Sequence, residues 1–244
     1  MLDVYLRTSL GDRFRLTGTP ATSPVLSPYG ALETLRANVS RSDLAVPGGA
    51  GVLPGRRRFG AIQTELEFYL QTETGEELAE VYARLRRGWS QATWDNPCMI
   101  EIEGDHPLNT LVFDLVVDGV LPGVQVDMSR RTQETLKVPV VCRDGMARTD
   151  VQTGRGSVTV TNAGDTLIYP RIVYEGDGGR VTSPSGAAFT LPGVSERTTV
   201  DLDPLKLRLD GAVSEGVPPG ESGTWKLPAG ARLEWWLMVA DPWA

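Results

Sequence analysis

The chain has 244 residues, of which 41% are apolar and 23% are charged, and its formal net charge is −7. This balance is typical of a globular protein long enough for two domains, and the negative charge argues against a protein that coats nucleic acid with a basic stripe. Glycine (27 residues) and proline (17 residues) are frequent but not periodic, which favours a turn-rich, all-β protein over collagen-like or disordered sequence.

The first 58 residues are expected to form one or two short strands and then a long irregular segment. Apolar and polar residues alternate over residues 4–16, as they do in strands. Residues 17–58 contain five prolines and the run Pro47-Gly48-Gly49-Ala50-Gly51, with at most a short extended stretch at 32–44. A segment of this length without periodicity is typical of an arm, an insertion or an interface loop.

The clearest strand and the one convincing helix follow. Over residues 62–70 an apolar face alternates with a polar one. The apolar face carries Ile62, Thr64, Leu66, Phe68 and Leu70. Next, Thr74-Gly75-Glu76-Glu77 forms a capping box, which predicts a helix over about 74–89. Its apolar stripe is Leu78, Val81, Tyr82, Leu85 and Trp89.

Three more strands are predicted at 98–103, 111–120 and 134–142. The inward face of the third is Leu136, Val138, Val140 and Cys142. Pro139 falls in the middle of this run, which favours an edge strand or a bulge. Cys98 and Cys142 are expected to be small buried hydrophobes on strands, because two cysteines in a chain of this size do not make a disulfide framework.

The polar segment 143–155 separates two predicted domains, 1–150 and 151–244. Further strands are predicted at 157–161, 166–175, 187–191, 198–202, 205–209 and 232–239. Short strands at this spacing, with no helical pattern between them, indicate an antiparallel sandwich. The expected fold class is mainly β, with an N-terminal barrel-like or sandwich-like domain carrying one amphipathic helix and a C-terminal β-sandwich.

No arrangement of residues predicts catalysis, a cofactor or a metal site. The only histidine, His106, lies in a turn-like sequence, and one histidine cannot complete a zinc site. Motifs for a serine nucleophile, a phosphate loop or a dinucleotide are absent from the sequence. Glu101, Glu103 and Asp105 alternate along a predicted strand, as do Asp201 and Asp203, and each set could meet a sugar or bind calcium. Because Glu101 and Glu103 alternate with Ile100 and Ile102, we interpret them as the solvated face of a half-buried strand.

Neither a signal peptide nor a membrane span is expected. The start, Met1-Leu2-Asp3-Val4, lacks a basic region followed by a long apolar stretch. No apolar run approaches the 18 or so residues that a span needs. We therefore expect a protein that is made in a cytoplasm and does not enter a membrane.

Three tryptophans are candidates for contact with a ligand or a partner. Trp225 precedes a proline turn, and Trp235 and Trp236 point to opposite faces of the last predicted strand. One of this pair is expected in the core. The other is either a platform for a sugar or a protein partner, or an aromatic covered by the first domain.

An ordered series of turn signals covers the second half. Residues 157–176 run as a strand, the turn Asn162-Ala163-Gly164, a Tyr169-Pro170 pair, a strand and a glycine. Thr199-Val200-Asp201-Leu202 follows, and residues 225–233 form a closing hairpin signal. This series resembles the C-terminal domain of the distal tail proteins of long-tailed phages. The chain departs from that pattern where an alanine splits the usual Pro-Gly pair and Arg232 replaces asparagine. Residues 1–150 resemble the N-terminal domain in outline only.

The resemblance implies a minor tail protein of the tail tip or baseplate, assembled in the cytoplasm of a bacterial host. N-terminal domains of this family close into a ring, commonly a hexamer, and DNA passes through the lumen without specific binding. The C-terminal domain would be a galectin-like sandwich outside the ring. The expected partners are further copies of the chain, the tail tube protein, the tail-associated hub protein and an adhesin at the rim.

Three other functions stay open at this point. The chain is alternatively a carbohydrate-binding module of a tail adhesin, with an exposed tryptophan as the platform. It is alternatively a tail tube or tail terminator subunit, although those are usually single-domain rings. A glycosidase would need a pair of carboxylates at a defined separation, which the sequence does not supply.

Overall fold

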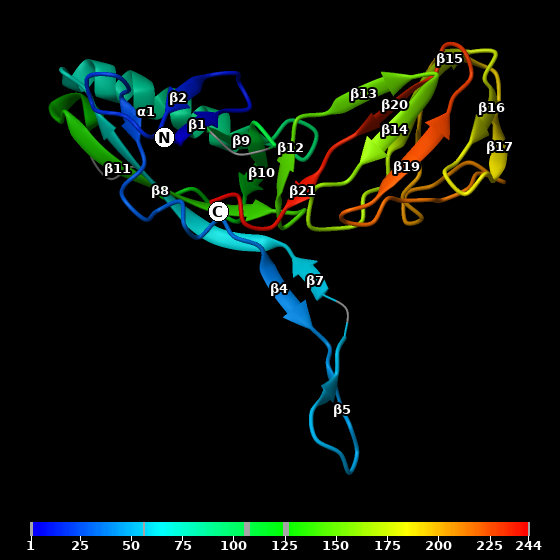
Figure 1. Cartoon of the computed structure of the whole chain (residues 1–244). Coiled ribbons are helices and arrows are strands. Elements are labelled where there is room, and N and C mark those ends of the chain that lie inside the picture. The colour runs from blue at the N-terminus through cyan, green and yellow to red at the C-terminus, as the bar shows by residue number, and fades with distance from the viewer. Residues whose placement is uncertain (1, 56, 105–107, 124–126, 244) are drawn as a thin grey trace. The chain divides into compact units, whose positions relative to one another are not determined.

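The computed structural model describes residues 2–55, 57–104, 108–123 and 127–243, and the predicted mainly β fold with one α-helix in this part is confirmed (Figure 1). The chain forms two compact units. The first contains the residues up to Ala147 and those from Ala240 onward, and the second is Arg148–Val239. The chain therefore crosses between the units twice.

The first unit is built on a nearly closed, barrel-like antiparallel sheet in the order β2-β1-β9-β10-β11-β8-β3. Its strands are β1 (Asp3–Arg7), β2 (Arg13–Arg15), β3 (Val25–Leu26), β8 (Ile62–Gln71), β9 (Cys98–Glu103), β10 (Leu111–Val117) and β11 (Gln133–Cys142). Residues 111–115 of β10 pair with β9, whereas Val116 and Val117 pair with β11. This change of partner along one strand joins the two halves of the sheet.

Helix α1 (Gly75–Ser90) follows β8 and begins at the predicted capping box. The Thr74 hydroxyl accepts a hydrogen bond from the Glu77 amide at 3.2 Å, and the Glu77 carboxylate accepts one from the Thr74 amide at 3.3 Å. The buried stripe of the helix is Leu78, Tyr82, Leu85, Gly88 and Trp89. The Trp89 ring centroid lies 5.9 Å from that of Phe68 in β8, so helix and sheet share one core. A short 3₁₀ turn, η1 (Met128–Arg130), lies against α1.

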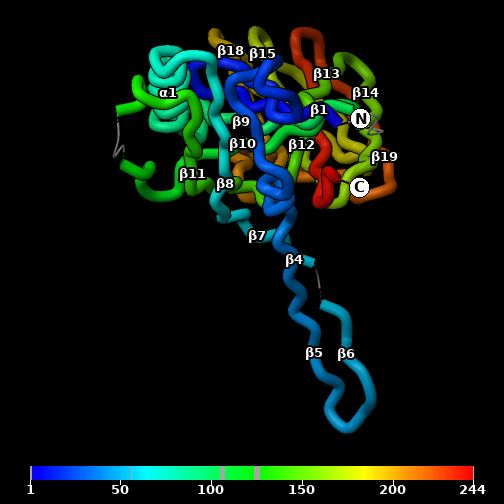
Figure 2. Tube along the Cα trace, turned by 90° about the vertical axis from the view of Figure 1, so that its left-hand side faces the viewer, coloured from blue at the N-terminus to red at the C-terminus, as the bar shows by residue number. Residues whose placement is uncertain are grey.

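Residues 38–60 form a two-stranded extension of the first unit, which we call the arm (Figures 1 and 2). Its stem consists of β4 (Asn38–Arg41) paired with β7 (Arg57–Gly60), and its outer part of β5 (Leu44–Ala45) paired with β6 (Val52–Leu53). β7 leads directly into β8. The irregular segment expected at 17–58 therefore contains an arm, together with β3, which pairs with β8.

The second unit contains two antiparallel four-stranded sheets, in the orders β13-β20-β15-β18 and β14-β19-β16-β17. The strands are β13 (Gln152–Arg155), β14 (Ser157–Thr161), β15 (Arg171–Gly176), β16 (Gly179–Thr182), β17 (Ala188–Leu191), β18 (Val194–Asp201), β19 (Ser222–Lys226) and β20 (Arg232–Trp235). The short strands β12 (Ala147–Thr149) and β21 (Met238–Val239) pair with each other. Val160, Ile172, Val181 and Leu233 are fully buried and contribute one core residue from each of four strands.

The strand predicted at 205–209 is wrong. The amides of Lys206 and Leu207 both donate to the Asp203 carbonyl oxygen at 2.8 Å, which makes a turn. The Asp203 side chain also accepts a hydrogen bond from the Leu205 amide at 3.0 Å. An aspartate that bonds to the backbone two residues ahead favours a turn over an extended strand, even where Leu and basic residues alternate.

Of the edge or bulge predicted at Pro139, the bulge is wrong, because the pairing of β11 with β8 is continuous through that residue. On its other side β11 pairs with β10 only at Val140 and Val141, so Pro139 lies where β11 becomes an edge. The Pro139 carbonyl oxygen accepts a hydrogen bond from the Asp118 amide at 2.9 Å, just past the end of β10. Because the ladder with β10 stops there, the missing N–H of the proline costs no strand hydrogen bond.

Candidate interaction surfaces

The outer part of the arm exposes apolar side chains. Leu44 and Leu53 lie across from each other in the pairing of β5 with β6, and they are 66% and 59% exposed. Val52 in β6 and Val39 in β4 are exposed as well. A two-stranded hairpin is marginally stable alone in water, and clustered exposed apolar groups mark interaction sites. The tip of the arm is therefore a candidate contact with a partner.

The stem of the arm is basic. Between residues 38 and 60 the ionisable side chains are Arg41, Asp43, Arg56, Arg57 and Arg58. Arg41 lies directly opposite Arg57 in the β4–β7 pairing, and like charges in this position destabilise a strand pair. Asp43 offsets part of the repulsion, since its Oδ1 lies 3.4 Å from Arg41 Nε. Within the described ranges no carboxylate forms an ion pair with Arg57 or Arg58, so the stem favours an anionic group from outside.

An apolar groove lies beside β1 and β3. Its volume is about 440 Å³, and its apolar lining is Leu2, Val4, Leu16, Leu26, Pro28, Tyr29, Leu32 and Trp243. Trp243 is held there because its indole N–H donates to the Leu35 carbonyl oxygen at 3.0 Å. Tyr29 is fully exposed at the groove. We call this surface the apolar groove, and its composition suits aliphatic or aromatic side chains of a partner.

A second cavity, of about 550 Å³, lies where β8 leads into α1. It is lined by residues 20–24, Gln71, Thr72, Glu73 and Glu77. Glu76 and Glu80 are exposed on the adjoining turns of α1, so four carboxylates occupy eight consecutive residues. No lysine or arginine of the described chain lies within ion-pair distance of these carboxylates. We call this surface the acidic cleft.

The three candidate tryptophans differ in exposure. Trp225 is fully buried, and Trp235 is buried with 8% of its surface exposed. Trp236 is half-buried, and the Arg171 guanidinium carbon lies 5.2 Å from its ring centroid. Trp236 is therefore the only one of the three that offers surface to a ligand or a partner.

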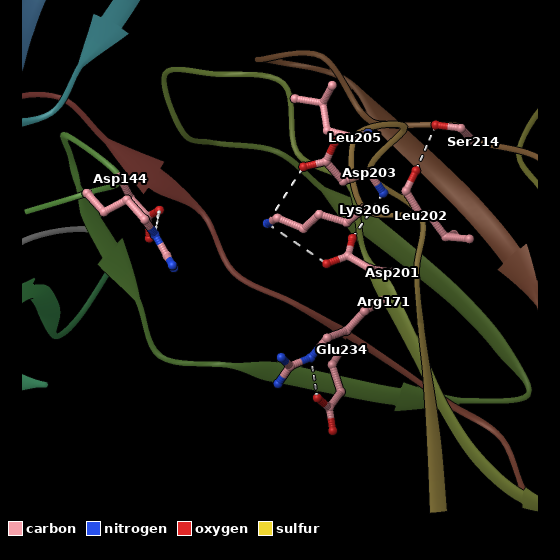
Figure 3. Close-up of polar contacts among 10 residues, drawn as sticks. Asp144, Arg171, Asp201, Leu202, Asp203, Leu205, Lys206, Ser214 and Glu234 are labelled. Carbon is pink, nitrogen blue, oxygen red and sulfur yellow. Dashed lines mark hydrogen bonds and ion pairs between the residues drawn. The ribbon is translucent and has the colours of Figure 1, made fainter. Parts of the chain in front are cut away.

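A buried carboxylate, Glu234, organises one face of the second unit (Figure 3). It accepts hydrogen bonds from Arg171 Nε at 2.8 Å and Arg232 Nε at 2.7 Å, and its side chain is 5% exposed. Burial by itself would raise the pKa of Glu234, but the bonds from Arg232 and Arg171 outweigh it, and the pKa lies below its usual value. Asp201 and Asp203 hold Lys206 nearby, at 4.0 and 3.7 Å. All these charges are paired, which is typical of a structural network.

The carboxylates of β9 form a similar network, and the solvated face predicted for Glu101 is wrong. Its side chain is 5% exposed and pairs with Arg7 at 2.5 Å and Arg13 at 2.9 Å. Arg13 also reaches Glu103 at 2.5 Å. His106 lies outside the described residues. Among those that are described, no group of three His, Cys, Asp or Glu side chains could hold a metal ion.

Comparison with known proteins finds structures with a similar fold, but no similar sequence. No protein family profile and no curated protein matches the sequence. Solved structures do match. A chain of the phage P2 baseplate in its activated conformation with Ca gives a TM-score of 0.59 at 9% identity, over 97% of this chain and 98% of that one. The Dit protein (gp 19.1) of phage SPP1, described as a paradigm of hub adsorption apparatus, gives 0.52 at 12% identity, over 98% and 99%.

The match covers both units, so the likeness of fold to these phage proteins extends over nearly the whole chain. The Sr-bound form of the p2 baseplate gives a similar result, with a TM-score of 0.58 at 8% identity over 97% and 98%. Within the described ranges, no helix combines the length and the apolar character needed to cross a bilayer.

Proposed function

We propose that this protein is a structural, non-catalytic subunit of a phage tail tip, and that its first units associate into a hexameric ring between the tail tube protein and the hub. The ring would surround a channel through which DNA passes without specific binding. The second units, galectin-like sandwiches in this proposal, would lie outside the ring. The end-to-end likeness to the baseplate and Dit chains supports this assignment.

The arm is the single observation that carries the proposal. A hairpin whose leucines at 44 and 53 face solvent gains no stability from the core of its own chain. Such a segment is stable when a partner covers it, and in a ring of identical subunits this partner is the next copy of the chain. Contacts of one patch with a different patch on the next copy close into a ring when the rotation allows it.

The carbohydrate-binding alternative depends on an exposed tryptophan. Burial of Trp225 and Trp235 leaves Trp236, which already stacks against Arg171. The ion pairs that hold Glu234 also leave few free polar groups on that face. The arrangement therefore supports the ring subunit more strongly than the sugar site.

A shortened-arm variant tests the proposal. Asn38 pairs with Gly60, so residues 38–60 can be replaced by a two-residue Asn-Gly turn without moving the flanking chain far. We expect the full chain to form six-fold rings by mass photometry and negative-stain imaging, alone or with its tube and hub partners. The shortened variant should stay monomeric with unchanged thermal unfolding.

Leu205→Ser is the matched control, because Leu205 is 83% exposed in the second unit and lies outside the arm. It should assemble like the unmodified chain. A full chain that remains strictly monomeric in the presence of both partners would contradict the proposed function.

A further inference from the structure

The first unit carries two oppositely charged groups of side chains that form no ion pair within the described chain. One is Arg57 and Arg58, which are exposed on β7 in the arm stem. The other is the acidic cleft, where Glu73 and Glu77 line the cavity. The basic stem occurs in a chain whose net charge is −7, so it is a local feature. Each surface has the charge that the other lacks.

These surfaces lie at opposite ends of one strand. β8 begins at Ile62, immediately after the arm, and ends at Gln71, which lines the acidic cleft. Ten strand residues span roughly 30 Å at about 3.3 Å each. The arm of a copy therefore points away from its own cleft unless the chain folds back along the whole of β8. A second copy placed head to tail can bring its acidic cleft to the stem arginines of the first copy without any such change in the chain.

We propose that the arm of one copy docks on the next copy, with the stem arginines in the acidic cleft. This inference rests on the proposed function and adds the surface that receives the arm. It also accounts for the direct opposition of Arg41 and Arg57, because carboxylates of the neighbour relieve the repulsion. Arginine suits such a contact, since its planar guanidinium pairs with carboxylates in a bidentate geometry.

The order of surfaces along the chain agrees with this docking. On the arm, the arginines lie in the stem and the leucines at 44 and 53 lie further out. On the receiving copy, Pro24 lines the acidic cleft and Leu26, two residues later, lines the apolar groove. An arm that places its arginines in the cleft thus has the apolar groove nearby for its leucines, and charge and apolar contacts support the same orientation.

A charge-swap experiment tests the inference. Arg58→Glu and Glu73→Arg each place like charges in the contact, and Glu73 takes no part in the capping box. We expect each single variant to raise the dissociation constant between copies about tenfold or more at low salt, measured by sedimentation or mass photometry. The double variant carries the reversed pair in every contact, and its dissociation constant should return toward that of the unmodified chain.

Cross-linking gives an independent readout. Arg58→Cys combined with Glu73→Cys should form disulfides between copies under mild oxidation, whereas Arg58→Cys with Glu196→Cys should not. The native thiols will not interfere, because Cys98 and Cys142 are buried and burial raises the pKa of Cys98 to about 12. Unfolding curves of all variants should match that of the unmodified chain.

The outcomes separate this inference from the proposed function. Rings that form equally well in both single variants overturn the docking site and leave the ring subunit intact. A chain that never associates, with or without its partners, overturns the proposed function and this inference with it. If Arg58→Glu weakens binding to duplex DNA in a gel shift and leaves assembly unchanged, the stem binds phosphates and the docking site is wrong.

Discussion

β7 and β8 are consecutive strands separated by one residue, Ala61, yet they have opposite surroundings. β8 buries Ile62, Leu66, Phe68 and Leu70, whereas β7 buries none of its four residues. β8 is paired along its whole length with β11, and β7 pairs only with β4 of the arm. The first strand after the arm thus belongs to the folding core of the unit, and the strand before it does not.

This difference teaches that one continuous β-ribbon can lie partly inside the folding core and partly outside it. Core residues of β8 stabilise the isolated chain, because they are removed from water when it folds. Residues of the arm gain stability only from a surface that covers them. Substitutions in the two strands should therefore separate the stability of the monomer from the strength of its assembly, and the following predictions test that separation.

The largest effect is expected in the shared core of β8 and α1. Phe68→Ala removes a fully buried ring that packs 5.9 Å from Trp89, and should lower the free energy of unfolding by about 3–5 kcal/mol. Phe59→Ala is the matched control nine residues earlier, in β7, and should change it by less than about 1 kcal/mol. Urea unfolding at neutral pH measures both. Equal losses would show that the arm is part of the folding core.

A smaller effect is expected at the Glu234 network of the second unit. Glu234→Gln removes a buried charge from three arginines that remain partly exposed, Arg171, Arg197 and Arg232, so the cost should be about 1–2 kcal/mol at pH 7. Glu196→Gln, at an exposed position of β18, is the control and should change little.

The pH dependence of this loss has a defined sign. Because the pKa of Glu234 is lowered in the folded protein, its contribution is present above the unfolded value of about 4.3 and disappears as the pH falls through the folded value. Unfolding curves of the unmodified chain and of Glu234→Gln should therefore differ most at neutral pH and converge as the pH falls below about 4.3. A difference that persists unchanged as the protein is acidified would mean that the charge is not what stabilises the sheet.

The helix cap gives an effect of about 1 kcal/mol. Thr74→Ala removes the hydroxyl that accepts from the Glu77 amide, and losses of this kind destabilise a helix by about that amount. Glu76→Gln, in the same turn but outside the capping box, is the control. Differential scanning calorimetry should show a lower Tm for Thr74→Ala alone. An unchanged Tm would indicate that packing of the buried stripe, beginning with Leu78, fixes the start of the helix without the cap.

Much of this architecture follows from local patterns, and the exceptions have physical reasons. The alternation over β8 and the capping box of α1 predict their elements correctly, because one face of each is buried in the same core. Three strands were not predicted, because they are rich in glycine, serine and threonine and show no clear apolar alternation: β13, β16 and β19. They adopt an extended conformation because they pair with strands that are distant in the sequence. The ion pairs of Glu101 depend on Arg7 and Arg13, which no spacing within β9 reveals.

The interaction surfaces were only partly predictable. The prolines and glycines of residues 17–58 indicate an arm, but not the β-pairing that sets Arg41 opposite Arg57. The run Arg56-Arg57-Arg58 and the carboxylates between Glu73 and Glu80 are visible in the sequence. Their significance comes from topology, since β8 separates Arg57 and Arg58 from Glu73 and Glu77, and none of these four side chains forms an ion pair within the described residues.

The arm should also differ from β8 in the protection of its backbone amides from hydrogen exchange. In the monomer, the free energy of opening the outer hairpin of the arm is expected to be close to zero. In the monomer, amides of β5 and β6 should exchange with solvent at nearly the rate of an unstructured peptide, because no core holds the outer hairpin. Amides of β8 should open only with global unfolding. In assembled particles the arm amides should slow by at least about tenfold, as coverage by a neighbour raises their opening free energy. Hydrogen exchange read by mass spectrometry resolves the two segments. Arm amides as protected in the monomer as those of β8 would mean that the hairpin is stable without a partner, and its exposed leucines would then need another explanation.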